Sequence, residues 1–312
     1  AGQFLRFDPD AKHEVSWEQP LWLHFRVRAD SPTLATEWTL ALDKPFIDRV
    51  EFYARSPQGG WQMQAAGDWT AHKQWPQRSL NPQLYLPALS PGEHDFYVRV
   101  FNQVPVHFSM QWLPTANANL QMQQTFTLAA LMLGFMGLMC LLSSALALVY
   151  RNAAYAWYAL YVAIIGLAFT SHVGIGSYAL WPSATWWPEE STALCVMAAM
   201  LAHLLFCRAM FVSPRAALGL HRAVSACAVL GCLAIGIYVT VHIHILQIVL
   251  FVLVVFSCMA LMVSTVLTAL HQHRVVAWLW LVAYIPLLLV IVCTVVDALG
   301  WYALPWLPYQ TP

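Results

Sequence analysis

Charged side chains are scarce in the second part of this sequence. Only eight of them follow Thr115, although charged residues make up 10% of the 312 residues as a whole. The formal net charge of zero therefore conceals a polar first part and an apolar second part. Such a charge distribution gives no reason to expect a nucleic acid as a partner.

Cysteine is missing from the first 139 residues, and all seven cysteines lie in the apolar part. No disulfide can therefore cross-link the polar part. The cysteines do not have the spacing of a zinc site, and we expect them to be small apolar residues of membrane helices. His242 and His244 could share a metal across one residue, but as interfacial polar side chains they need no metal. We predict no metal site.

Lysine is missing from the apolar part, because Lys12, Lys44 and Lys73 are the only three lysines. A light-driven retinal protein needs a lysine in a membrane helix to form its Schiff base, so that class is excluded. The sequence also lacks a G-x-S-x-G motif and a glycine-rich phosphate loop. We therefore predict no catalytic residue, no cofactor and no enzymatic activity within these residues.

Long apolar runs fill residues 125–312. The first, Thr125–Val149, has 25 residues without a charge or a proline. About 20 such residues in a helix cross the ~30 Å hydrocarbon core of a bilayer. The sequence predicts a polytopic helical bundle in the lipid bilayer, with a seventh span missing or only begun at Gly300–Pro312. The six complete spans are predicted at residues 125–149, 153–173, 191–212, 223–241, 245–270 and 275–296.

The connections between these spans differ in charge. The basic residues of the apolar part fall in or beside the first, third and fifth connections, whereas the second and sixth contain Glu189, Glu190 and Asp297 and the even-numbered connections contain no lysine or arginine. The positive-inside rule places the basic connections in the cytoplasm and residues 1–115 outside. Ionisable residues are rare inside the spans, which disfavours a transporter. The basic residues are Arg151, Arg208, Arg215, Arg222 and Arg274.

Short alternating segments characterise residues 1–115. Pro20–Ala29 alternates apolar and polar side chains, as expected of a strand with one buried face. The same period appears at residues 38–42, 50–54, 96–100 and 108–112, and Ser56–Gly60 has the composition of a hairpin turn. The sequence predicts an all-β sandwich at residues 1–115, a linker at residues 116–124 and the membrane domain at residues 125–312.

The longest irregular segment of the predicted sandwich lies at residues 69–82. Its side chains include Trp69, Lys73, Trp75 and Arg78. Aromatic faces beside cationic donors suit a sugar, a carboxylate or another small organic ligand, so these four are the predicted ligand-binding residues. The alternative, which the sequence leaves open, is a loop whose tryptophans cap one end of the sandwich.

Tyr155–Pro182 resembles the second-helix signature of bacterial seven-transmembrane receptors with diverse intracellular signalling modules, the 7TMR-DISM family. Its Tyr-rich entry is followed by Gly174 and by an exit at Leu180-Trp181-Pro182. Residues 1–115 are similar to that family's jelly-roll sensor domain. The matching segments are PLWLHFRV (Pro20–Val27), VEFYARSPQGGW (Val50–Trp61), Gly67-Asp68 and FYVRV (Phe96–Val100).

The resemblance implies a sensory receptor of the bacterial inner membrane, with residues 1–115 in the periplasm. It implies a small periplasmic ligand, a carbohydrate or a carboxylate, and it allows a homodimer because paired outputs often need two copies. The family's seventh helix and its cytoplasmic output module, a diguanylate cyclase or histidine kinase, are not in the sequence. Together with the first residue Ala1, this suggests a fragment or a processed product. The alternatives are a non-signalling binding or scaffold protein that recognises a periplasmic partner, and a small-solute transporter.

Overall fold

The computed structural model describes residues 13–15, 20–34, 37–56, 59–102, 106–211, 218–241 and 243–272, and the positions 275, 278, 279 and 282. The chain divides into two compact units. The first contains residues 1–137 and 165–195, and the second contains residues 138–164 and 196–312. The first unit thus combines the β-strands with the adjoining ends of three helices.

A four-stranded antiparallel sheet forms one layer of the first unit, in the order β2–β7–β4–β5. In β2, Leu23 is buried whereas Trp22 is exposed, which confirms the predicted alternation. The predicted hairpin turn joins β4 to β5, with the Gly59 amide donating to the Ser56 carbonyl. The four strands are Leu21–Ala29 (β2), Gly92–Phe101 (β7), Arg49–Arg55 (β4) and Trp61–Ala66 (β5).

A three-stranded antiparallel sheet forms the second layer, in the order β6–β3–β9. Leu40, in the central strand, lies opposite Leu84 on one side and Trp112 on the other. Two further strands, β1 and β8, pair with each other in a separate two-stranded antiparallel sheet. The strands are Gln83–Tyr85 (β6), Trp38–Leu42 (β3), Met110–Pro114 (β9), His13–Val15 (β1) and Val106–Phe108 (β8).

The core lies between the inner faces of the two larger sheets. Phe52 and Phe96 from the four-stranded sheet stack with ring centroids 5.5 Å apart, and Trp112 from the other sheet meets Phe52 edge-on at 6.0 Å. Leu40 and Leu84 are fully buried in the same cluster. The predicted β-sandwich is therefore confirmed; its jelly-roll subtype stays a prediction.

Four strands were not apparent from the sequence pattern. Strands β1, β6 and β8 have only three residues each, too short for a period of two to stand out. The edge strand β5 reads WQMQAA, in which Trp61 and Met63 alternate with glutamines, but these two apolar side chains are exposed, so the alternation does not mark a buried face.

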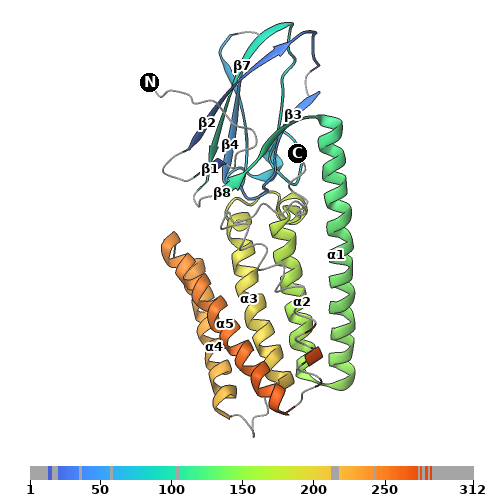
Figure 1. Ribbon diagram of the computed structural model, residues 1–312, viewed down its shortest axis with the longest axis vertical. Coiled ribbons are helices and arrows are strands. Elements are labelled where there is room, and N and C mark those ends of the chain that lie inside the picture. The colour runs from blue at the N-terminus through green and yellow to red at the C-terminus, as the bar shows by residue number, and fades with distance from the viewer. Residues whose placement is uncertain are drawn as a thin grey trace. The chain divides into compact units, whose positions relative to one another are not determined.

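Five long helices follow the sandwich (Figure 1). Within the part of the chain that the structure describes, these five are long and apolar enough to cross a membrane. The turn between the first two is short, and the Asn152 side chain caps the second by accepting from the Ala154 amide at 2.9 Å. The predicted sixth span, residues 275–296, and the start of a seventh lie outside the described ranges. The helices are Thr115–Tyr150 (α1), Ala153–His172 (α2), Trp186–Phe211 (α3), Leu218–Thr240 (α4) and His244–Gln272 (α5).

Residues 116–124, predicted as a separate linker, form the first turns of α1. The helix begins directly after β9, and the Thr115 amide donates to the Glu37 carbonyl at 2.9 Å. The sequence TANANLQMQQ (115–124) contains no glycine or proline, so nothing in it stops the helix from extending beyond the apolar run. The predicted linker is therefore helical because its own sequence contains no residue that ends a helix.

In the second unit, the helices pack through aromatic and small side chains. The Tyr161 ring of α2 lies 4.6 Å from the His203 ring of α3. An added Cβ on Gly231 of α4 would lie 2.5 Å from the Leu201 side chain of α3, so this glycine allows a close approach. Arg208 at the end of α3 donates to the Ser225 hydroxyl of α4 at 2.6 Å.

Candidate functional site

The segment from Gly67 to Pro82, here called the sensor loop, leaves the edge strand β5 and returns at β6. Gly67 has φ +116°, and a Cβ there would lie 2.6 Å from the Asp48 carbonyl oxygen, so a glycine is required where the two backbones meet. The Asp68 amide donates to the Ile47 carbonyl and the Trp69 amide to the Asp48 carbonyl, both at 2.9 Å. These bonds fix the beginning of the loop to the segment before β4.

Trp75 holds the sensor loop closed on the sandwich. Its side chain is buried in the core, and its indole N–H donates to the Thr70 carbonyl at 2.9 Å. The His72 ring packs on it with centroids 4.4 Å apart, and His72 Nε2 lies 2.7 Å from the Ser79 carbonyl oxygen. For Trp75, the structure therefore supports the capping role that the sequence left as the alternative.

The other three predicted ligand residues lie apart from Trp75. The Trp69 ring is partly exposed and packs on Phe101, with centroids 4.8 Å apart. The Lys73 side chain is exposed, as is that of Arg78. The Arg78 guanidinium lies over a ring of the α2–α3 connection, that of Tyr178, at 5.2 Å. The four residues thus share a loop but make separate contacts.

Within the first unit, the sensor loop contacts the α2–α3 connection. That connection contains a π-helical turn, Gly176–Leu180 (η2). The Lys73 amide donates to the Pro182 carbonyl at 3.0 Å, and Arg78 Nη2 donates to the Tyr178 carbonyl at 3.4 Å. The Tyr178 ring also meets His72 edge-on at 5.6 Å. Tyr178 and Pro182 belong to the Tyr155–Pro182 signature, but nothing in the sequence pairs them with the loop.

The loop also contacts the beginning of α1. The Gln77 side-chain amide donates to the Asn119 side-chain oxygen at 3.1 Å. Below this bond, Leu80 of the loop packs in a small apolar cluster with Ala129 of α1 and Val173 after α2. Phe126 of α1 meets the Tyr178 ring at 5.0 Å in the same cluster. One loop therefore contacts two segments that lead into membrane-spanning helices.

A pocket of about 230 Å³ opens beside the sensor loop, and all of its lining residues belong to the first unit. Of the four predicted ligand residues, only Trp75 lines it. The other lining residues were not predicted from the sequence, because they come from four separated segments of the chain. The lining residues are Pro45, Phe46, Asp68, Trp75, Leu80, Ser171, His172, Gly174, Ser177, Pro188 and Thr192.

Burial of the His72 ring lowers the pKa of that imidazole below its ordinary value of 6.5, and the charge of Arg78 lowers it further; the contact with the Ser79 carbonyl opposes both. The His72 ring therefore favours its neutral form in the folded loop. Among the described residues, no group of three histidine, cysteine, aspartate or glutamate side chains could hold a metal ion. His242, one of the two histidines considered from the sequence, lies outside the described ranges.

Comparison with protein families covers both parts of the chain. Residues 125–311 match the family described as 7TM diverse intracellular signalling, and residues 6–113 match 7TMR-DISM extracellular 2. The chain belongs to the 7TMR-DISM family. It is a receptor-like membrane protein with an extracellular domain before its helical region, in the order that the resemblance implied. Both domain types are sensory rather than catalytic. A search of the curated proteins finds no match.

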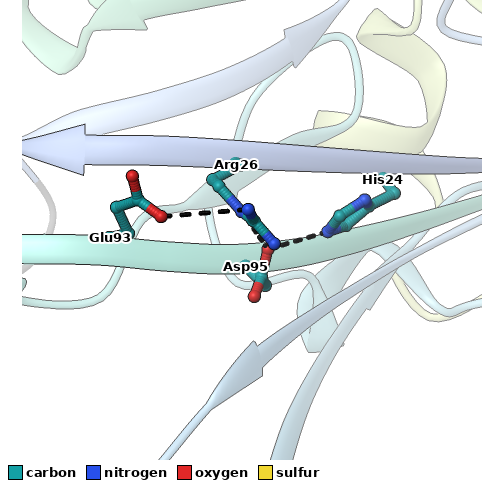
Figure 2. A network of polar contacts seen from close by, with 4 residues as sticks. All are labelled: His24, Arg26, Glu93 and Asp95. Carbon is teal, nitrogen blue, oxygen red and sulfur yellow. Dashed lines mark hydrogen bonds and ion pairs between the residues drawn. The ribbon is translucent and has the colours of Figure 1, made fainter. Parts of the chain in front are cut away.

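The outer face of the four-stranded sheet in this 7TMR-DISM extracellular domain carries a network of charges (Figure 2). Asp95 Oδ1 accepts from Arg26 Nε at 3.0 Å and lies 2.9 Å from His24 Nε2, and Glu93 lies 3.8 Å from Arg26. The hydrogen bond from Arg26, and then that from His24, lower the pKa of the Asp95 carboxyl. The Arg26 side chain is 60% exposed, and pairs at such exposed positions contribute little to stability.

Aromatic rings alternate with these charges on the same face. Trp22 stacks on Tyr53 at 5.9 Å, and the Arg99 guanidinium lies over the Trp22 ring at 5.7 Å. Trp61 of the edge strand meets Tyr97 at 5.3 Å. Because the rings contact one another across strands, they stabilise the sheet and also form a continuous half-exposed surface.

Glu51 is the one buried carboxylate on this outer face among the described strands. Its two oxygens contact Arg49 Nε at 2.7 Å and Arg99 Nη1 at 3.3 Å, and Tyr53 donates to it at 2.8 Å. Burial raises the pKa of the Glu51 carboxyl, but the Tyr53 hydrogen bond and the two arginines outweigh it, so the pKa lies below its ordinary value of 4.5.

Replacing Glu51 by glutamine is expected to reduce the acid sensitivity of the domain. A carboxylate with a lowered folded-state pKa stabilises the fold above its unfolded-state pKa, and this stability is lost as pH falls through the folded-state pKa. Glu51→Gln should cost about 1–3 kcal/mol at pH 7 and much less at about pH 3. Thermal unfolding of both proteins across this pH range measures the difference. Glu93→Gln, at an exposed carboxylate, is the control, and an equal response from both variants would contradict the expectation.

Proposed function

We propose that the chain is a sensory receptor of the bacterial inner membrane. Its extracellular domain, in the periplasm, binds a small polar molecule and passes the signal through the helices to a cytoplasmic output module such as a diguanylate cyclase or histidine kinase. The observation that carries this proposal is the sensor loop, which contacts both the beginning of α1 and the α2–α3 connection. A change in the loop therefore alters contacts of two membrane-spanning segments at once.

The energetic requirement on such a receptor is modest. A ligand shifts an equilibrium between two arrangements only by the difference in its affinity for them, and coupling between sites is typically about 1–3 kcal/mol. The Gln77–Asn119 hydrogen bond and the Arg78 contacts with Tyr178 are interactions of that order. Making or breaking them is sufficient to bias the helices.

The periplasmic position is supported by the charges at the helix ends. Arg151 lies in the α1–α2 turn, Arg208 in the last turn of α3 and Arg222 near the beginning of α4. Because the positive-inside rule assigns these ends to the cytoplasm, the opposite ends and the sandwich lie outside. A carbohydrate or a carboxylate, as the sequence and the resemblance suggest, defines the first set of ligands to test.

A second function is favoured by the exposed aromatic surface of the sheet. Trp22 and Trp61 are each nearly half exposed, and Met63 beside them is 50% exposed. Exposed aromatic rings and methionines are enriched at protein interfaces. In this alternative the domain recognises a periplasmic protein partner without signalling. Trp22→Ala would then abolish function, whereas changes in the sensor loop would not.

The receptor proposal is tested on the full chain in nanodiscs against sugars and organic acids. A true ligand raises the unfolding temperature, because binding adds about 2.7 kcal/mol of stability at a hundredfold excess over Kd. Hydrogen exchange of residues 115–124 and 171–182 reports whether binding reaches the helix ends. We expect a ligand to raise the unfolding temperature and to change the hydrogen exchange of both segments. Gln77→Ala should weaken the change in hydrogen exchange, whereas the ligand should still bind.

Arg28→Ala serves as the control for the receptor test, because the Arg28 side chain is 78% exposed and pairs only at the surface, with Asp30. It should leave binding and exchange unchanged. A ligand that binds tightly but leaves exchange at the helix ends unaltered would contradict the signalling role and favour the scaffold alternative.

A further inference from the structure

His72 occupies a buried position where the sensor loop meets the α2–α3 connection. It begins the short 3-10 turn His72–Gln74 (η1) and is 2% exposed. Its ring packs on Trp75, with centroids 4.4 Å apart, and meets the Tyr178 ring of η2 edge-on at 5.6 Å. All of these residues lie in the first unit. A change in this one side chain therefore acts on the core contact of the loop and on its contact with the connection.

The two nitrogens of the His72 ring have different surroundings. Nε2 lies 2.7 Å from the Ser79 carbonyl oxygen, which can only accept, so Nε2 carries the hydrogen of the neutral ring. Nδ1 is then the unprotonated nitrogen, and it is buried without a hydrogen-bond partner among the described residues. A proton taken up by the ring would bind at Nδ1 and create a buried N–H without an acceptor, which is unfavourable in the folded loop.

The charge that acts on the His72 ring disfavours protonation as well. The Arg78 guanidinium lies over the other contact of the ring, Tyr178, at 5.2 Å, and guanidinium groups are always positive. Burial first and then the Arg78 charge lower the pKa of His72, whereas the Ser79 carbonyl raises it. The two aromatic rings that pack on His72 are a neutral phenol and an indole, so neither contributes a carboxylate. A protonated His72 would thus be poorly accommodated in the closed loop, meaning the loop with these contacts.

Opening of the loop would remove these constraints on the imidazole. In water an imidazole has its ordinary pKa of about 6.5 and finds acceptors for both N–H groups. The open loop therefore binds a proton more readily than the closed loop. By linkage, the closed loop has its full stability above about pH 6.5 and loses stability as the pH falls below that value.

We propose that the sensor loop responds to acidification, with protonation of His72 at Nδ1 opening the loop and releasing its contacts with the α2–α3 connection. The release begins next to His72, because the Lys73 amide donates to the Pro182 carbonyl at 3.0 Å. The proton is then a second stimulus at the loop that carries the proposed function. The inference rests on that function only for the step from an open loop to a signal.

Hydrogen exchange of the full chain in nanodiscs at about pH 7.5 and about pH 5 tests the proposal, with rates corrected for the intrinsic effect of pH on exchange. The reporting amides are those of Lys73, Gln74 and Trp75, which all donate to backbone carbonyls in the closed loop. Their protection should fall at the lower pH, by up to about tenfold if the pKa of His72 is one unit lower in the closed loop than in the open one. The amides of β7, which is paired on both sides in its sheet, should stay protected.

His72→Gln separates protonation from packing. A glutamine side chain can still donate to the Ser79 carbonyl but has no group that takes up a proton in this pH range, so the acid-induced loss of protection should disappear. His72→Phe is a second neutral variant, which keeps an aromatic ring against Trp75 and Tyr178 if glutamine disturbs the loop. Both variants should show the same exchange of the loop amides at the two pH values.

The matched control is His94→Gln. His94 Nε2 also lies close to a backbone carbonyl oxygen, that of Ser90 at 2.8 Å, but this contact is exposed, so the variant should keep the acid response. The proposal is overturned if exchange of the loop amides does not rise at the lower pH, if β7 loses protection together with them, or if the rise persists in both His72 variants. A rise that depends on His72 but leaves exchange of residues 115–124 and 171–182 unchanged would uphold the acid-sensitive loop and contradict the receptor function, so the two failures are distinguishable.

Discussion

Replacing Gly174 by alanine is expected to separate the sensor loop from the end of α2. Gly174 has φ +82°, a conformation that costs an L-residue about 1–2 kcal/mol. An added Cβ would lie 2.5 Å from the Leu80 carbonyl oxygen and 3.1 Å from Pro45 Cβ. Because the closest atom belongs to the backbone, the loop itself must move. The expected cost is therefore about 2 kcal/mol or more, together with loss of the pocket that Gly174 lines.

Hydrogen exchange of the amides in residues 69–82 and thermal unfolding of the full chain measure this effect. The control is Gly134→Ala, because a Cβ on this α1 glycine meets nothing within 4 Å and alanine is the better helix former. Gly134→Ala should be neutral or slightly stabilising. If both variants exchanged and unfolded alike, the close approach at Gly174 would not be required for the contact.

Replacing Phe52 by alanine should produce the largest loss of stability in the extracellular domain. Phe52 is 1% exposed, and it lies in β4, which is paired on both sides by β5 and β7. Its ring contacts Phe96 and Trp112, so truncation leaves a cavity between the two sheets. Such substitutions cost about 3–5 kcal/mol, which is a large fraction of the stability of a small domain.

The unfolding of the domain can be followed by tryptophan fluorescence of the full chain in detergent as urea is added. Met63→Ala on the outer face of the neighbouring strand is the control, since Met63 is 50% exposed and its loss should change stability by about 0.5 kcal/mol or less. A Phe52→Ala domain that unfolds at the same urea concentration as Met63→Ala would contradict the position of the core.

The architecture was predictable because it depends on patterns along the chain. A period of two identifies β2, where Leu23 is buried and Trp22 exposed, and an uncharged run of 25 residues identifies the membrane-crossing part of α1. The beginning of α1 was not predicted correctly, because a polar segment without helix breakers looks like a linker until its contact with Glu37 is known.

The pocket could not have been predicted in this way. Trp75 was predicted to bind a ligand because it is an aromatic residue in a loop. Its burial and its hydrogen bond to Thr70 depend on the packing of the loop against the core. Asp68, Phe46 and Thr192 have no common spacing and come together only when the sandwich meets the helix ends. Gly174 is part of the Tyr155–Pro182 signature, but the signature does not predict the close approach of this glycine to Leu80.

The direct passage from β9 into α1 sets the angular phase of the helix. Pro114 ends the strand and Thr115 begins the helix, with no glycine between Thr115 and Leu133 to absorb a twist. Each residue added at this junction would turn the following side chains by about 100° around the helix axis. When this extracellular domain is grafted onto another helical bundle, the register of the splice therefore decides which side of the first helix faces its neighbours.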